Sequence, residues 1–482
     1  MKKVFFKAFL LCMAICMLMS LATGCEKDPS TEEGTEESES NAEVVHIVTP
    51  VNLGGKEFHF AVSKWYEYEP LKFTDIYVET YTGDYVQDAA YERNMYMEEF
   101  FNCSISMSEF QESELATKLE QNAMAGDQGF DFVLFRGEQY TAAVNGGYLA
   151  SVEDFGLDTE NPWWDSNAIE AMTLNGRCYG LVGDVTINHL LAVHMTCFNK
   201  DLVENYSAML ENPYELVESG KWTLDKMIAM AKSIANDTLD GVDGMGANDL
   251  WGIHYTRDNV QGLLVSCGVR VVELNADNKP TLTIASYQSQ VQDILTKLYD
   301  ETFATDTIGR VICKAENSDT EYFDEGNVLF LLTATHNASA LRQSEVNYGI
   351  LPYPKSSETG DYISNAAGTY YSILGIPTNN QNYNQSAAFL EAYAAQGYQN
   401  VRPQFYENVL LRKVGRDDES YEMLKFIFEN LTYDIGCMFG IINAELSATS
   451  DSQDPIFTGV VAKNRLKWKT NLDKFLEAYD FS

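Results

Sequence analysis

The stretch from residue 161 to residue 202 constrains the fold more than any other part of the 482-residue chain. It begins with two tryptophans, Trp163 and Trp164, in a polar turn, and it ends with an apolar run from His189 to Phe198. A run of this length with β-branched and aromatic members, bounded by polar turns, is typical of a buried strand. We predict that this strand crosses from one lobe to another. The two tryptophans are then expected to be exposed at the mouth of an interdomain cleft, where ligand sites concentrate.

Helical and strand patterns alternate before this stretch. Residues 56–65 alternate between polar and apolar types, which predicts a first strand that ends at Trp65. The expected elements after it are helices over 85–102 and 113–126 and short strands over 103–107 and 130–135. This order indicates a parallel α/β lobe. Ligands of open α/β sheets bind beyond the carboxyl ends of the strands, so Trp65 is a candidate for the cleft.

The composition argues against several functions. A formal net charge of −38 argues against nucleic acid as a partner, because binding a polyanion requires a basic face. The chain contains no G-x-S-x-G, H-E-x-x-H or P-loop motif. His189 and His194 are five residues apart on the predicted strand, hence on opposite faces, which argues against a metal pair. Widely spaced cysteines after residue 25 predict buried thiols rather than a disulfide framework or a zinc site. We therefore expect neither a metal nor a cofactor.

The N-terminus has the pattern of a targeting segment. Three lysines precede an apolar run, and the sequence LATGC, residues 21–25, closes it. This closing sequence resembles a bacterial lipobox, which implies a lipoprotein signal peptide over 1–24 and acylation (palmitate) at Cys25. A plain secretory signal and a transmembrane anchor are the alternatives. Residues 25–43 are acidic and lack large apolar side chains, which predicts a flexible tether.

Several motifs follow one another along the chain in a recognisable order: PWWD, LNGRCYGLVGD, CFNKDL, GKWTLDKM and NYGILPYPK. Together they resemble the family 1 extracellular solute-binding lipoproteins of ABC importers, the maltose-binding-like class. The resemblance implies an α/β, two-lobed periplasmic-binding-protein-like fold of type II, in which each lobe is a sheet flanked by helices and hinge strands join the lobes. Residues 44–190 and 362–400 are expected in the N-terminal lobe, and residues 191–361 and 401–482 in the C-terminal lobe.

The resemblance also implies a ligand loop after the strand over 130–135. Maltose-binding relatives carry an acid and a base there, which fall at Glu138 and Gln139, with Arg136 nearby. Sugar hydroxyls both donate and accept hydrogen bonds, so carboxylate, amide and guanidinium groups bind them well. A solvated loop pair is the alternative for Arg136 and Glu138, and a structural clamp under the cleft rim is the alternative for the tryptophan pair. The complete set of expected ligand-binding residues is Trp65, Arg136, Glu138, Trp163, Trp164, Asp184, Trp251 and Tyr371.

These observations favour a monomeric, lipid-anchored binding protein on the extracellular side of the cell membrane. We expect it to capture a solute, a mono- or oligosaccharide above all, and to deliver it to an ABC permease. The Gly/Asp-rich loop over 240–249 is expected to be a plain turn, because apolar residues interrupt the oxygen ligands that calcium requires. Two alternatives remain open: a secreted carbohydrate-active enzyme that uses two carboxylates, and a binding-only receptor for a sensor system.

Overall fold

The computed structural model describes residues 48–64, 74–236, 249–299, 308–310, 321–337, 341, 344–366, 372–407, 417–442 and 457–481. The chain divides into two compact units, residues 1–46 and residues 47–482, and all the described residues belong to the second unit. The expected signal peptide, tether and acylated Cys25 lie outside the described residues, as do Trp65, Tyr371 and most of the loop over 240–249. Among the helices of the described part, none is both long enough and apolar enough to cross a membrane.

The first lobe is built on a four-stranded sheet in the order β12-β3-β1-β2. Its strands are β1 (Lys56–Lys64), β2 (Cys103–Gln111), β3 (Phe132–Phe135) and β12 (Ile373–Gly375). The first three strands are parallel, and β12 joins the edge of β3 in the antiparallel direction. The predicted α/β lobe is therefore present, with one strand that comes from far along the chain.

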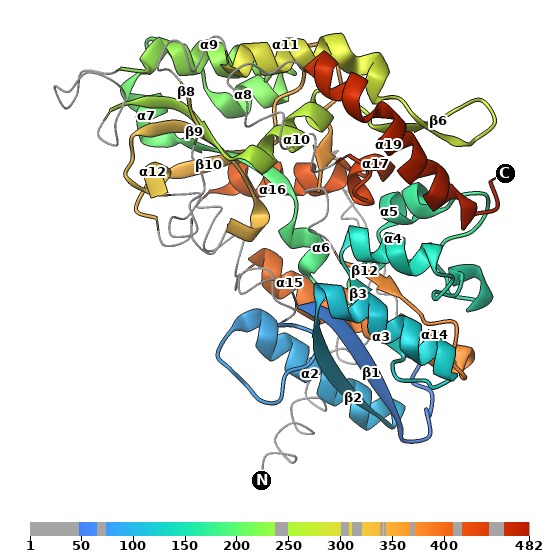
Figure 1. Cartoon of the computed structure of the whole chain (residues 1–482). Helices are drawn as coiled ribbons and strands as arrows, with labels where there is room; N and C mark the ends of the chain where they lie inside the picture. Colours follow the sequence, from blue (N-terminus) through green and yellow to red (C-terminus); the bar gives the residue numbers. More distant parts are fainter. Residues whose placement is uncertain are drawn as a thin grey trace, which may run out of the picture. The chain divides into compact units, whose positions relative to one another are not determined.

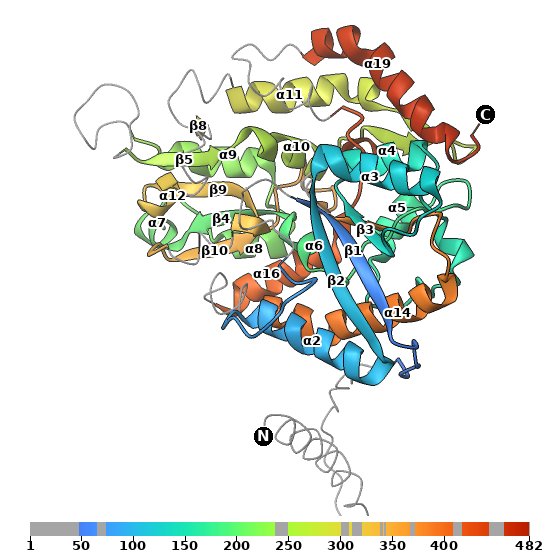
Figure 2. The same ribbon diagram turned by 60° about the horizontal axis from the view of Figure 1, so that its bottom comes forward.

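Helices cover both faces of this sheet (Figure 1). Figure 2 shows α2 (Tyr85–Phe101) and α14 (Tyr383–Gln396) on one face, and α3 (Glu112–Ala125) and α4 (Gly137–Asn145) on the other. The ring of Phe389 in α14 stacks on Phe58 of β1, with the two centroids 4.1 Å apart. Aromatic burial of this kind supplies much of the free energy that holds a helix on a sheet.

The second lobe is built on a five-stranded mixed sheet in the order β10-β4-β9-β5-β8. Its strands are β4 (His194–Asn199), β5 (Trp251–Tyr255), β8 (Ile308–Arg310), β9 (Val328–Ala334) and β10 (Tyr348–Leu351). All six residues of β4 are buried, which confirms the buried strand expected from the apolar run. Trp222 is fully buried before α9 (Leu224–Ile234), and Thr223 caps that helix, in line with the preference of helix N-caps for threonine.

The predicted strand over residues 189–198 is too long at its start. A short helix, α6 (Asn188–Leu191), precedes β4, so His189 and His194 do not share a strand. A side-chain oxygen helps to explain why these residues are helical rather than extended. The hydroxyl of Thr186 accepts a hydrogen bond from the amide of Asn188 at 3.2 Å. Local bonds from side chain to backbone offer the chain an alternative to the ladder of a sheet.

The remaining helices and short strands complete the described part of the chain. They are η2 (Val152–Asp154), α5 (Ser166–Met172), α7 (Lys200–Asn205), α8 (Pro213–Glu218), α10 (Arg257–Ser266), β6 (Val272–Leu274), β7 (Pro280–Leu282), η3 (Ile284–Tyr287), α11 (Gln288–Tyr299), α12 (Glu321–Asp324), η4 (Thr335–Asn337), β11 (Ser364–Asn365), the π-helix η5 (Gly397–Val401), α15 (Arg402–Gln404), α16 (Asp418–Glu429), β13 (Leu431–Thr432), α17 (Ile435–Met438) and α19 (Phe457–Glu477).

The chain passes from the first sheet to the second through residues 184–193, which we call the crossing segment. Just before it, Leu181 forms a β-bridge with Leu374 of β12. At its end, Val193 forms a β-bridge with Ala366, next to β11. The crossing segment is thus attached to one lobe at its start and to the other at its end.

Candidate functional site

The tryptophan turn lies directly against the start of the crossing segment. Trp164 and Gly183 form an antiparallel β-bridge, and the amide of Asp184 donates to the carbonyl of Trp163 at 2.9 Å. A Cβ atom on Gly183 would lie 2.3 Å from that carbonyl oxygen, so this close pairing requires glycine. The turn and the start of the crossing segment therefore form one unit of the first lobe.

The expectation that the two tryptophans are exposed is wrong. Trp163 is 2% exposed and Trp164 is 4% exposed. The indole Nε1 of Trp163 donates to Oε2 of Glu391 at 2.8 Å, and the same carboxylate accepts from the amide of Asp158. A buried indole requires a hydrogen-bond partner, and α14 supplies one. Burial of both tryptophans agrees with the alternative interpretation of the pair, a structural clamp under the cleft rim. Contact of the pair with a ligand stays a prediction.

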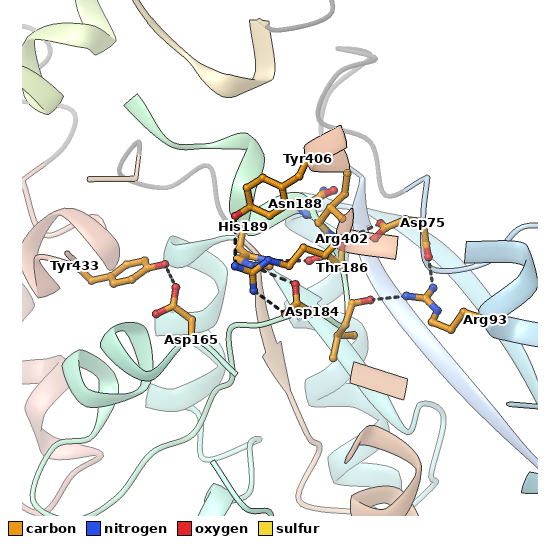
Figure 3. A network of polar contacts seen from close by, with 12 residues as sticks. Asp75, Arg93, Asp165, Asp184, Thr186, Asn188, His189, Arg402, Tyr406 and Tyr433 are labelled. Carbon is orange, nitrogen blue, oxygen red and sulfur yellow. Dashed lines mark hydrogen bonds and ion pairs between the residues drawn. The ribbon is translucent and has the colours of Figure 1, made fainter. Parts of the chain in front are cut away.

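A charged cluster occupies the start of the crossing segment (Figure 3). Asp184 is 4% exposed, and its Oδ2 accepts a hydrogen bond from Nη1 of Arg402 at 3.2 Å. Its Oδ1 lies 4.0 Å from Nε2 of His189. The guanidinium of Arg402 lies 5.4 Å from the ring of Tyr398 and 5.3 Å from the ring of Tyr406, and it donates to the hydroxyl of Tyr406.

Burial controls the electrostatics of this cluster. It raises the pKa of Asp184, although the nearby Arg402 acts to lower it. For Arg402, burial is the largest influence and lowers the pKa, but the interactions with Asp184 and Tyr406 together outweigh it and the pKa of the guanidinium is raised. The nearby guanidinium therefore favours the charged form of Asp184 in a site where burial disfavours it.

A π-helical turn brings Arg402 to Asp184. The π-helix η5 ends one residue before Arg402, and a Cβ atom on Gly397, its first residue, would lie 1.8 Å from the carbonyl oxygen of Asp184. The two backbone segments can approach this closely only because residue 397 has no side chain. Turns of this type are rare in proteins, and many of those that do occur lie at functional sites.

Two hydrogen bonds next to this cluster join elements of the two lobes. Asp165 caps α5 by accepting from the amide of Ala168 at 2.9 Å. Its other oxygen accepts from the hydroxyl of Tyr433, just after β13, at 2.5 Å. The side-chain amide of Asn167, the second residue of α5, donates to the carbonyl of Leu431 at 2.8 Å. Both bonds connect the start of α5 in the first lobe to the β11–β13 ribbon of the second, and Figure 3 shows the one between Asp165 and Tyr433.

A groove of about 760 Å³ lies between α5, the β6–β7 hairpin and the β11–β13 ribbon. Its lining includes aromatic and hydrogen-bonding side chains: Asn167, Glu170, Arg270, Asp361, Tyr362 and Tyr433. A second cavity, of about 960 Å³, shares Glu170 and Leu274 with it. Volumes of this size accommodate small-molecule ligands. We call the 760 Å³ space the interlobe groove.

The structure does not bring all the expected residues together. Asp184 and the tryptophan pair meet, but Glu138 is exposed on α4 and lines a separate cavity of about 580 Å³ with Lys474. Arg136 is half-buried at the N-cap position of α4. Trp251 begins β5, and its ring lies 5.0 Å from His254. A ligand contact stays a prediction for Arg136 and Trp251, whereas Glu138 lies at a cavity apart from the interlobe groove, so the binding site proposed below does not include it.

Sequence reasoning missed three residues of the site: Arg402, Tyr406 and Tyr433. Residues 402–406 carry no motif that points to a ligand site, and no local pattern marks the π-helical turn before them. The partner of Arg402 is 218 residues away in the sequence, so no spacing rule connects the two. Among the described residues, no group of three or more His, Cys, Asp or Glu side chains is placed to hold a metal ion.

We predict that replacing Tyr433 with phenylalanine weakens the connection between the lobes. The change removes only the hydroxyl that donates to Asp165 and keeps the ring. Hydrogen bonds to charged groups contribute about 1.5–3 kcal/mol when buried, and partial exposure here reduces the expected loss to about 1 kcal/mol. Urea unfolding measures it. The same change at the exposed Tyr77 serves as the control and should alter stability by less than about 0.5 kcal/mol. Equal effects at both positions would contradict the prediction.

Comparison with known proteins adds two findings. The family model described as bacterial extracellular solute-binding protein matches residues 93–403. The fold is similar to that of a cyclic α-maltosyl-1,6-maltose-binding protein from Arthrobacter globiformis, with a TM-score of 0.56. The two sequences are 14% identical, and the match covers 89% of this chain and 98% of that one. A substrate-binding protein of an ABC system from Listeria monocytogenes, in complex with cycloalternan, gives a TM-score of 0.54, 14% identity, and coverage of 89% and 100%.

A sugar transporter from Rhizobium etli in an open conformation gives a TM-score of 0.55 at 15% identity and covers 88% of this chain and 99% of that one. A search of curated protein sequences finds no match. The structural similarity shows the two-lobed fold, in agreement with the sheets described above.

Proposed function

Because the chain belongs to the family of bacterial extracellular solute-binding proteins, we propose that it binds a mono- or oligosaccharide between its two lobes. The observation that carries this proposal is the interlobe groove, which is bordered by the Asp165–Tyr433 bond and combines tyrosine rings with carboxylate, amide and guanidinium groups. Aromatic rings present flat apolar faces to a sugar ring, and the polar groups bind its hydroxyls. The solved structures of similar fold include proteins whose ligands are saccharides, which supports this solute class.

Binding and lobe movement are coupled in this proposal. The Asp165–Tyr433 and Asn167–Leu431 bonds join the two lobes beside the groove, so separation of the lobes there breaks both. A solute that contacts both walls stabilises the closed arrangement over the open one, and its free energy of binding then favours closure. The closed arrangement is the form that we propose an ABC permease receives.

We also propose that the protein is anchored outside the cell by acylation of Cys25 and works as a monomer. The LATGC sequence and the acidic residues after it support the anchor. The acidic tether, repelled by its own charge, would hold the binding lobes away from the membrane. Mass spectrometry of the protein from its own cells would show an acylated peptide that begins at Cys25. A peptide with an unmodified cysteine, or one that begins at another residue, would contradict the anchor.

The solute class is tested by a thermal-shift panel on the chain without residues 1–24. The panel contains maltotriose, mannotriose and cyclic glucans, with amino acids and short peptides as controls. A saccharide at 100 times its dissociation constant should add about 2.7 kcal/mol to the free energy of unfolding. Chromatography should recover that saccharide unchanged. Consumption of the saccharide would replace the binding role by an enzymatic one, and a shift with peptides alone would contradict the saccharide class.

A further inference from the structure

Two buried charged residues that take no part in the proposed solute contacts lie beneath the crossing segment. Asp75 is 0% exposed, and Arg93, on the inner face of α2, is 1% exposed. Burying charges costs free energy unless hydrogen bonds compensate for the lost water. The hydrogen bonds of these two side chains therefore indicate which part of the structure they stabilise.

Both side chains bind the crossing segment, at three consecutive residues. Oδ1 of Asp75 accepts from the hydroxyl of Thr186 at 2.8 Å, and Oδ2 accepts from the amide of Ile187 at 2.8 Å. Nη1 of Arg93 donates to the carbonyl of Val185 at 3.3 Å. Figure 3 shows the two side chains on the far side of the crossing segment from Tyr433.

The support for these contacts comes entirely from the first lobe. Nη2 of Arg93 donates to the hydroxyl of Tyr393 in α14 at 2.6 Å and also contacts the carbonyl of Asp75. The guanidinium carbon lies 3.9 Å from the centre of the Tyr393 ring. The Tyr393 hydroxyl donates to the carbonyl of Ile76 at 2.8 Å. Helices α2 and α14 and residues 75–76 thus hold one another in place around the pair.

The end of the crossing segment is attached to the second lobe instead. The Thr335 hydroxyl of η4 donates to the carbonyl of Leu190 at 2.5 Å, and the Thr335 amide donates to the carbonyl of Val193 at 2.9 Å. Residues 185–187 are therefore fixed to one lobe and residues 190–193 to the other. Asn188 and His189 are the residues between the two attachments.

We propose that Asp75 and Arg93 are positioning residues for solute binding. They hold the backbone of residues 185–187, so that Asp184 before it and His189 after it keep their places in the charged cluster, next to the Asp165–Tyr433 bond that borders the interlobe groove. A displacement of about 1 Å in a supporting segment is enough to weaken a binding site. The effect on affinity rests on the proposed function, whereas the effect on the backbone does not, and the two are measured separately.

The backbone effect is tested with Asp75→Asn in the chain without residues 1–24. The substitution preserves the shape of the side chain and removes its charge. Hydrogen–deuterium exchange of peptides that cover residues 184–193 should become roughly tenfold faster, because a charge-assisted hydrogen bond is lost. Asp131→Asn is the matched control. Asp131 is also buried in the first lobe, where it accepts from the His59 amide at 3.0 Å and pairs with Lys56.

The control should leave exchange in the crossing segment unchanged. Unchanged exchange in Asp75→Asn, or an equal increase in both variants, would overturn the proposal. If Asp75→Asn does not fold, Thr186→Val, which removes only the hydroxyl that donates to Asp75, should accelerate exchange in the same peptides. Unchanged exchange in that variant overturns the proposal as well.

The effect on binding is tested by calorimetry with maltotriose and mannotriose as probes. For whichever probe binds the natural chain, Asp75→Asn should weaken the affinity about tenfold, while Asp131→Asn leaves it within about twofold. Faster exchange without any loss of affinity would overturn the positioning role. If neither probe binds the natural chain, the saccharide identified by the thermal-shift panel replaces them, and exchange decides by itself whether the pair holds the crossing segment.

Discussion

Replacing Arg402 with methionine should lower the free energy of unfolding by about 3–5 kcal/mol, because it leaves the carboxylate of Asp184 buried without a cation. The side chain of Asp184 is 3% exposed, so water cannot take the place of the guanidinium. Because methionine keeps most of the volume of the arginine stem, the decrease in the free energy of unfolding reports on the lost charge rather than on a cavity. Urea unfolding at pH 7 measures the change. A loss of less than about 1 kcal/mol would contradict this account of the cluster.

The pH dependence of the Arg402→Met variant provides an independent check. Burial raises the pKa of Asp184 above 3.8 even with Arg402 present, and removal of the arginine takes away the main influence that lowers it. A group whose pKa is higher in the folded state stabilises the fold increasingly as the pH falls through that pKa. The deficit of the variant should therefore shrink as the pH is lowered from 7 towards 3.8. A deficit that does not depend on pH would contradict the assignment to Asp184.

Replacing Gly397 with alanine should destabilise the chain by about 3 kcal/mol. The added Cβ would lie 1.8 Å from the carbonyl oxygen of Asp184, and a backbone atom cannot move aside as a flexible side chain can. Residue 397 has φ −60° and ψ −51°, a helical conformation in which alanine is favoured over glycine by about 1 kcal/mol. Any loss must therefore come from the collision with the crossing segment.

Gly360→Ala is the matched control for Gly397→Ala. Its Cβ would meet nothing closer than 3.5 Å, so the expected change is within about 0.5 kcal/mol. Gly397→Ala should also weaken saccharide binding, because it displaces Asp184 and Arg402 from each other. Thermal unfolding and calorimetry measure the two effects. Stability equal to that of the natural chain in Gly397→Ala would show that η5 does not require this close approach.

The parts of the fold that depend on local patterns could be predicted from the sequence. Strand β4 is buried at all six positions, as its apolar run indicated, and Thr223 caps α9. The short helix α6 could not be predicted, because it depends on side-chain contacts such as the bond from the amide of Ile187 to Asp75, 112 residues away. Apolar residues alone do not distinguish a buried turn of helix from an extended strand.

The site was predicted less completely than the fold. Asp184 was identified, but its partner Arg402 comes from a π-helical turn that no sequence pattern marks. The tryptophan pair was expected to be exposed and is buried, because Glu391 supplies the hydrogen bond that makes burial of Trp163 possible. Contacts of this kind depend on tertiary structure, which brings distant residues together.

The most direct test of solute binding in the interlobe groove is calorimetric titration of two tryptophan variants with the saccharide identified by thermal shift. Glu170→Trp places a bulky side chain in the interlobe groove, and Glu138→Trp places the same side chain in the separate 580 Å³ cavity. Both glutamates are exposed on helices, so the two variants are matched. We predict that Glu170→Trp weakens binding by at least about tenfold, while Glu138→Trp leaves it unchanged. Loss of binding in Glu138→Trp alone would place the solute at the α4 cavity and contradict the proposed site.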